Sequence, residues 1–136
     1  MSVVTLNDIV KGQYGSIYTI NVDGRKAVLT LRKDGSGYLN PLHNPRIWYD
    51  VRAQYLKDPQ DNVDGQTGPG YLGTPSNLKR RIVFWVDFPK TPNDPQDDQR
   101  FDGYFFTETK DGMAGVTWVS GMPLGFYALY EGDVIG

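Results

Sequence analysis

Hydrophobic and polar residues alternate with a period of two along much of this chain. The alternation is clear in residues 14–22, 26–32, 46–56 and 80–88. Successive side chains of a β-strand point to opposite faces, so this pattern is typical of strands with one buried face. We therefore predict a strand in each segment, with a further short strand at Tyr38-Leu39.

Short turns containing glycine separate the predicted strands. Aspartate followed by glycine favours a tight hairpin because both residues tolerate positive φ. The C-terminal third holds three aromatic-rich runs between such turns, and we predict three more antiparallel strands there. The predicted turns lie at Asp23-Gly24, Asp34-Gly35, Asp111-Gly112 and Ser120-Gly121-Met122-Pro123.

These segments add up to an all-β protein with eight antiparallel strands. A short helical turn is expected only within residues 3–9. Eight strands that are adjacent in sequence can close into an up-and-down barrel, which leaves no unpaired sheet edge. We predict a single domain over residues 1–136, an eight-stranded antiparallel up-and-down β-barrel, with a two-sheet β-sandwich as the alternative.

The arrangement of loops and core follows from this topology. Sequential strands run in opposite directions, so residues 41–45, 89–98 and 120–123 should share one end of the barrel and residues 57–77 the other. The more apolar face of each strand should point into the core. The expected core residues are Leu29, Leu31, Ile82, Phe84, Val86, Phe105 and Phe126.

Composition and charge narrow the classes of function. The chain has 136 residues, 16 glycines, 9 prolines, 13% aromatic residues and no cysteine. The net charge of −2 gives no basic surface for phosphate groups, so neither nucleic acid nor an anionic membrane is expected as a partner. Without cysteine there is no thiolate ligand, and we expect no cofactor and no metal.

The N-terminal residues carry no recognisable targeting signal. They lack a basic segment followed by a sustained apolar one, and no run approaches the ~20 apolar residues of a membrane span. We therefore expect a cytoplasmic location, with secretion through a removed signal left open.

No specific catalytic or metal-binding motif is found. The single histidine, His43, lies in a loop-like context without a paired nucleophile, and we interpret it as a surface residue. Two acidic groups do not fit a calcium loop. In the first, a register with Gly65 at the sixth position puts Gln60 first and Tyr71 last, where acidic ligands belong. The second has neither a glycine turn nor a distal glutamate, and we interpret both groups as solvated loops. They consist of Asp58, Asp61 and Asp64, and of Asp94, Asp97 and Asp98.

Aromatic and charged residues alternate on the less apolar strand faces and form the candidate ligand site. Indole and phenol rings offer flat apolar contact, while Asp and Arg offer directional hydrogen bonds. This combination suits a sugar, a cyclic metabolite or a polar heterocycle in a barrel mouth, and carbohydrate is the class we favour. The residues are Trp48, Asp50, Arg52, Trp85, Asp87, Tyr104, Trp118 and Tyr127.

Two other functions stay open. In a barrel enzyme of the cyclase or isomerase type, Asp50 or Asp87 would be the acid or base, which requires a closed cavity and a carboxylate of perturbed pKa. In a structural or assembly protein, the aromatic residues would instead form subunit contacts of a homo-oligomer.

Two segments resemble the avidin and streptavidin family. Residues 13–20, Gln-Tyr-Gly-Ser-Ile-Tyr-Thr-Ile, resemble its Leu-Gly-Ser opening strand, and residues 101–104, Phe-Asp-Gly-Tyr, resemble its Trp-Ser-Gly-Gln strand. The resemblance implies an avidin-like or calycin-like barrel. It also implies ligand contacts from Tyr14, Ser16 and Tyr18 on the opening strand.

This resemblance does not extend to biotin binding. The asparagine that the family places before its Gly-Ser pair is Gly12 here, and the tryptophans are not in register. Residues 113–129 are also similar to a repeat of Oscillatoria-type mannose-binding lectins, although this chain has no internal repeat.

Overall fold

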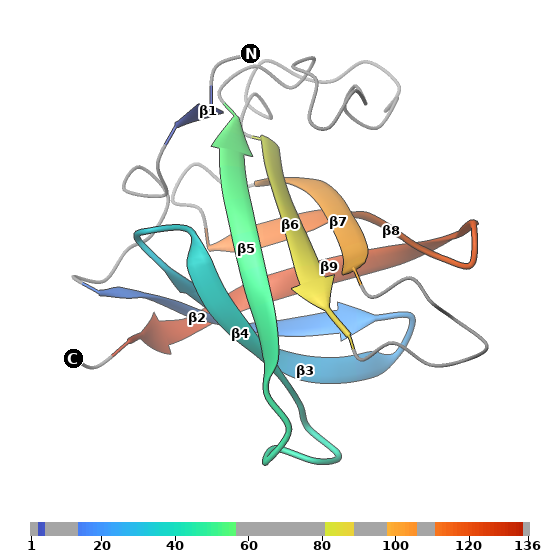
Figure 1. Ribbon diagram of the computed structural model, residues 1–136, viewed down its shortest axis with the longest axis horizontal. Helices are drawn as coiled ribbons and strands as arrows, with labels where there is room; N and C mark the ends of the chain where they lie inside the picture. Colours follow the sequence, from blue (N-terminus) through green and yellow to red (C-terminus); the bar gives the residue numbers. More distant parts are fainter. Residues whose placement is uncertain (1–2, 5–13, 57–80, 89–97, 106–110, 135–136) are drawn as a thin grey trace.

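The computed structural model describes residues 3–4, 14–56, 81–88, 98–105 and 111–134, and the findings below concern these ranges. They form nine strands in chain order (Figure 1). The strands are β1 (Val3–Val4), β2 (Gly15–Val22), β3 (Arg25–Arg32), β4 (Ser36–Pro41), β5 (Tyr49–Leu56), β6 (Arg81–Asp87), β7 (Asp98–Phe105), β8 (Gly112–Val119) and β9 (Met122–Asp133).

Strands β2 to β9 form a closed antiparallel barrel. Each strand pairs with the next one along the chain, and β9 returns to pair with β2. The pairing of β5 with β6 completes the ring, so the neighbour order is that of an up-and-down barrel. The predicted barrel is confirmed, and the sandwich alternative is wrong.

Strand β1 pairs with the end of β5, where Val3 lies opposite Leu56 and Val4 opposite Tyr55. The helical turn expected within residues 3–9 is therefore wrong at these two positions, because they pair with β5 beyond Ser36, the first residue of β4. Residues 5–9 lie outside the described residues.

Two of the predicted Asp-Gly turns are confirmed. Asp23 and Gly24 both have positive φ, 50° and 86°, as a two-residue type I′ hairpin requires. At the second turn, Gly35 has φ of 91°, and the Asp34 carboxylate accepts hydrogen bonds from the Ser36 backbone N–H at 2.9 Å and hydroxyl at 2.6 Å. These bonds lower the pKa of Asp34.

Three boundaries differ from the sequence prediction. Strand β4 covers Ser36–Pro41 rather than two residues. Strand β5 begins only at Tyr49, because Ile47 is held in a local turn: its N–H donates to the Asn44 carbonyl at 3.1 Å and its carbonyl accepts from Asn40 Nδ2 at 2.9 Å. The expected Asp111-Gly112 turn is also wrong, because Gly112 already belongs to β8.

The barrel interior is packed with apolar side chains. The Phe84 and Phe101 rings stack with centroids 4.7 Å apart, and Phe126 packs edge-on against both at 5.8 and 5.3 Å. Gly103 and Gly115 lie opposite each other on β7 and β8, and a Cβ on Gly103 would approach the Phe126 ring to 3.0 Å. The absence of a side chain at Gly103 makes room for Phe126, and a Cβ on Gly115 would instead meet the backbone of Asp102 and Gly103. All seven expected core residues are buried.

Alternating strand directions also fix the two ends of the barrel. Strands β2, β4, β6 and β8 finish at one end, and β3, β5, β7 and β9 finish at the other. The strand ends joined by residues 41–45, 89–98 and 120–123 therefore share one end, as predicted. Those joined by the segment that contains residues 57–77 lie at the opposite end.

Candidate functional site

The predicted site residues fall on both sides of the barrel wall. Ser16 and Tyr18 are buried on the inward face of β2, whereas Tyr14 precedes that strand and is exposed. The other eight residues lie on outward positions, between or beside core residues such as Val51 and Phe84. The structure therefore does not gather all the candidates at one place. Most of them belong to, or lie beside, four groups of residues with different chemistry.

The first group is a row of alternating arginine and tryptophan across four strands, Arg52, Trp85, Arg100 and Trp118, here called the Arg-Trp row. Arg52 lies opposite Trp85, and Trp85 lies opposite Arg100. The Arg52 guanidinium carbon is 4.1 Å from the Trp85 ring centroid, and that of Arg100 is 6.0 Å from the Trp118 ring. Both distances permit cation–π attraction. The row therefore uses ring faces for contacts within the protein.

Beside this row lies a buried charge cluster formed by Arg81, Asp102 and Arg100. Arg81 Nε donates to Asp102 Oδ1 at 2.8 Å, and Arg81 Nη2 also donates to Oδ2. Arg100 Nη2 donates to the same Oδ2 at 2.7 Å. The Arg81 and Asp102 side chains are 0% and 1% exposed although both face away from the interior. Such a two-pronged pair fixes both strands firmly.

Tyr104 belongs to this part of the wall, directly opposite Arg81. Burial raises the pKa of its hydroxyl, the Arg81 charge opposes that effect, and the Asp102 charge adds to it. Tyr104 is buried. It therefore offers no free surface to a ligand in this structure.

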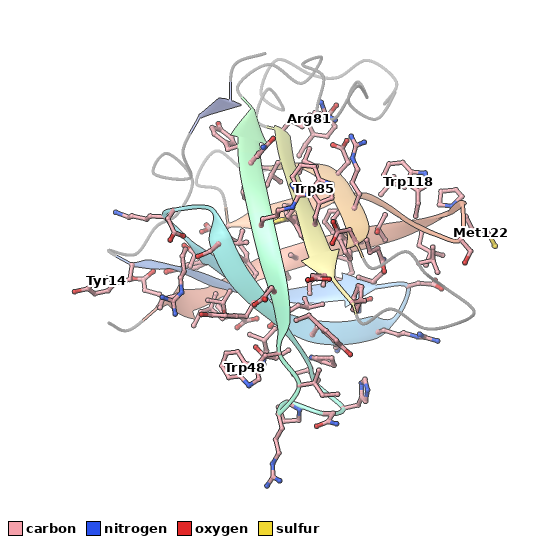
Figure 2. All side chains as sticks on the ribbon, in the orientation of Figure 1. Tyr14, Trp48, Arg81, Trp85, Trp118 and Met122 are labelled. Atoms are coloured by element: carbon pink, nitrogen blue, oxygen red, sulfur yellow. The ribbon has the colours of Figure 1, made fainter. Side chains whose placement is uncertain are left out.

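The third group is an exposed aromatic cluster on β3 to β5, here called the Trp48 platform and defined by Arg32, Tyr38, Trp48 and Asp50. Trp48 is 63% exposed and projects from the β4–β5 connection, directly before β5 (Figure 2). The Tyr38 and Trp48 rings are nearly perpendicular, with a centroid distance of 5.2 Å and an interplanar angle of 84°. Asp50 lies opposite Tyr38 in the sheet, and the Arg32 guanidinium is 5.2 Å from the Tyr38 ring. The platform offers an exposed indole with a carboxylate and a guanidinium nearby.

The fourth group is the interior pair Ser16 and Tyr18 at the barrel end where β2 begins. Burial raises the pKa of Tyr18 far above its ordinary value, and a hydrogen bond with Ser16 partly offsets the rise. The Tyr130 ring meets Tyr18 edge-on at 6.0 Å. Its own hydroxyl donates to Asp133, and this bond raises the pKa of Tyr130. The Ser16 and Tyr18 hydroxyls are thus buried at this end of the interior, whereas the Tyr130 hydroxyl bonds to an exposed carboxylate.

The remaining candidates are exposed. Asp87 lies on the outer wall, and Tyr127 faces outward on β9, where its hydroxyl accepts from Asn21 Nδ2 at 3.3 Å. His43 is exposed in the β4–β5 connection, as expected. Within the described ranges no three His, Cys, Asp or Glu side chains are placed to hold a metal ion.

The two acidic groups interpreted as loops are only partly described. Asp98 is the first residue of β7 and lies 3.6 Å from Arg52, so it is a strand residue rather than part of a loop. Asp58, Asp61, Asp64, Asp94 and Asp97 lie outside the described residues.

Sequence reasoning missed Arg81, Arg100, Asp102 and Tyr38. The alternation placed Arg81 on an outward face, which usually means exposure, and nothing in that pattern indicates burial on the outside of a barrel. Their roles depend on cross-strand register, which brings together residues such as Arg81 and Asp102 that lie far apart in the sequence.

The chain matches no model of a known protein family, no curated protein and no solved structure. The closed barrel is compatible with the calycin-like architecture that the sequence resemblance implied. In the parts of the chain described here, no helix is long and apolar enough to cross a membrane.

Proposed function

We propose that this protein is a non-catalytic carbohydrate-binding barrel whose ligand stacks on Trp48. The observation that carries the proposal is the high exposure of this indole, 63%, at the end of the β4–β5 connection, directly before β5. Removing apolar surface from water is favourable, so a ligand that covers this exposed ring gains binding free energy. The perpendicular contact with Tyr38 covers at most one face of the Trp48 ring, so at least one face can stack on a ligand.

The polar neighbours favour a sugar over a purely apolar ligand. A pyranose has one face of C–H groups that fits an indole and a rim of hydroxyls that needs hydrogen-bond partners. Asp50 accepts and Arg32 donates such bonds, and both belong to the same platform. An open surface with one stacking ring supports only weak affinity, on the order of a 1 mM Kd, or about −4 kcal/mol.

The avidin-like resemblance suggests a second position for the same kind of ligand. Ser16 and Tyr18 lie in the barrel interior, beside Tyr130. Their hydroxyls are the groups that the resemblance assigns to ligand contact. An avidin-like interior site is thus the alternative to the Trp48 platform within this proposal.

The enzyme alternative has less support. Asp50 and Asp87 are both exposed on the outer wall. An acid or base that shapes a reactive intermediate works best where water is excluded. Neither carboxylate has such surroundings among the described residues.

A glycan array with purified protein tests the proposal, with two tryptophan variants printed alongside. Trp48→Ala should lose binding, while Trp118→Ala should keep it, because Trp118 is also exposed but lies on β8. Retained binding in Trp48→Ala together with loss in Tyr18→Phe would favour the interior position. If the wild-type protein binds no glycan in solution at about 20 mM, the proposal is wrong.

A further inference from the structure

Trp48 lies in the connection between β4 and β5, and backbone hydrogen bonds fix the first half of that connection. The Leu42 N–H donates to the Lys26 carbonyl at 3.2 Å, which ties the connection to β3. The Asn44 N–H donates to the Pro41 carbonyl at 3.2 Å and closes the first turn. These bonds fix the chain as it leaves β4, but they do not involve the residues next to Trp48.

The second half of the connection depends on one side chain of β4. Asn40 Nδ2 donates to the Ile47 carbonyl at 2.9 Å and to the Pro45 carbonyl at 3.4 Å. The Ile47 carbonyl belongs to the peptide group that joins Ile47 to Trp48, so the shorter bond acts directly on the backbone that carries the indole. Asn40 is itself fixed, because it lies opposite Val28 in the pairing of β3 with β4.

The chain on the other side of Trp48 is fixed as well. Tyr49 is the first residue of β5, and its ring packs against Phe88 with centroids 4.7 Å apart. The Trp48 ring contacts Tyr38, and Tyr38 and Asn40 share one face of β4 because they are two residues apart in the strand. Two side chains of the same strand therefore hold Trp48, one at its ring and one at its backbone.

We infer that Asn40 is a positioning residue that fixes Trp48 in its exposed orientation before a ligand arrives. An indole that is 63% exposed has little packing of its own, so its position depends on the backbone that carries it. A ligand that stacks on a mobile indole must order the ring and the chain, and this ordering weakens binding. The effect on binding rests on the proposed function, whereas the fixed position of Trp48 does not.

Two substitutions remove the hydrogen-bond donor of Asn40 in different ways. Asn40→Ala removes the side chain beyond Cβ. Asn40→Asp keeps the shape of the side chain but directs an acceptor at the Ile47 carbonyl oxygen. Asn44→Ala is the matched control, because Asn44 lies in the same connection and its side chain forms no hydrogen bond with any residue that the structure describes.

Heteronuclear NOE measurements on the N–H groups of the sugar-free protein test the fixed position. In the wild-type protein, the backbone and indole N–H groups of Trp48 should be nearly as rigid as those of buried Trp85. Asn40→Ala and Asn40→Asp should lower the Trp48 values and leave those of Trp85 unchanged, whereas Asn44→Ala should match wild type. A general loss of stability would not produce this local change.

Glycan titration of the same proteins measures the consequence for binding. Both Asn40 variants should bind about tenfold more weakly than wild type, because the ligand must then fix the backbone of a mobile residue, and Asn44→Ala should bind as wild type does. Equal affinity in wild type and in a variant with a mobile Trp48 overturns the role in binding.

Two outcomes of the NOE measurements overturn the inference whether or not sugar binds. One is an unchanged Trp48 in a folded Asn40 variant. The other is a mobile Trp48 in the wild-type protein, which needs no variant to fold. A wild-type protein with a rigid Trp48 that binds no glycan contradicts the proposed function instead, so the two failures give different results.

Discussion

Substitution of Asp102 by Asn should destabilise the barrel strongly. The change keeps the volume of the side chain but removes the charge that receives hydrogen bonds from Arg81 and Arg100. Breaking a buried ion pair costs about 3–5 kcal/mol, because a charge stays buried without its partner. Domains of this kind have a total free energy of unfolding of about 5–15 kcal/mol. Asp102→Asn should therefore remove a large fraction of the stability.

Urea denaturation followed by intrinsic fluorescence measures this loss, and Asp98→Asn is the control. Asp98 and Arg52 are 3.6 Å apart with side chains 45% and 59% exposed, and exposed pairs contribute about 0–1 kcal/mol. High salt should abolish the small effect of Asp98→Asn and leave that of Asp102→Asn largely intact. A loss of under ~1 kcal/mol for Asp102→Asn, or equal losses for both variants, would refute the structural role of the pair.

Three further predictions concern packing and pH. Phe84→Ala removes the ring that stacks on Phe101 and should lower the free energy of unfolding by about 3–5 kcal/mol in urea; an unchanged midpoint would argue against the packed core. Gly115→Ala should lower the free energy of unfolding by about 1–3 kcal/mol or more, because the added Cβ would lie 2.1 Å from the Asp102 carbonyl oxygen. Gly125→Ala is the control: its added Cβ has nothing within 4 Å, so the melting temperature should not change. Burial raises the pKa of Tyr18 above its ordinary 10.0. Above pH 10.0 the hydroxyl therefore ionises in the unfolded chain before it ionises in the folded one, which favours unfolding. The stability that the neutral hydroxyl contributes is lost as pH rises above 10.0. The stability advantage of wild type over Tyr18→Phe, measured in urea, should shrink there, and a constant difference would contradict this.

The fold could be predicted because each strand carries its own signal. Leu29 and Leu31, or Ile82 and Phe84, alternate with polar or outward residues, and this pattern depends on one strand alone. The Asp23-Gly24 turn is equally local, since both residues need positive φ. The start of β5 was misplaced because side-chain bonds from Asn40 hold Ile47 in the preceding turn.

The candidate site could be predicted only in part, for a geometric reason. The alternation of hydrophobic and polar residues predicts whether Trp48 or Trp118 points outward. It does not predict the position of each residue around the barrel. Trp48 and Trp118 consequently belong to separate surfaces, and Trp85 is covered by Arg52. The partnership of Arg81 with Asp102 depends on the register between β6 and β7, which no single strand encodes.

Sugar binding at the Trp48 platform is the central claim, and the indole N–H signals in a two-dimensional NMR titration test it most directly. The chain has three tryptophans, so single Trp→Phe variants assign every signal. Titration with the best glycan from the array should shift the Trp48 signal and leave those of Trp85 and Trp118 in place. Shifts at Trp118 with none at Trp48, or no shift at any indole at saturating glycan, would contradict the claim.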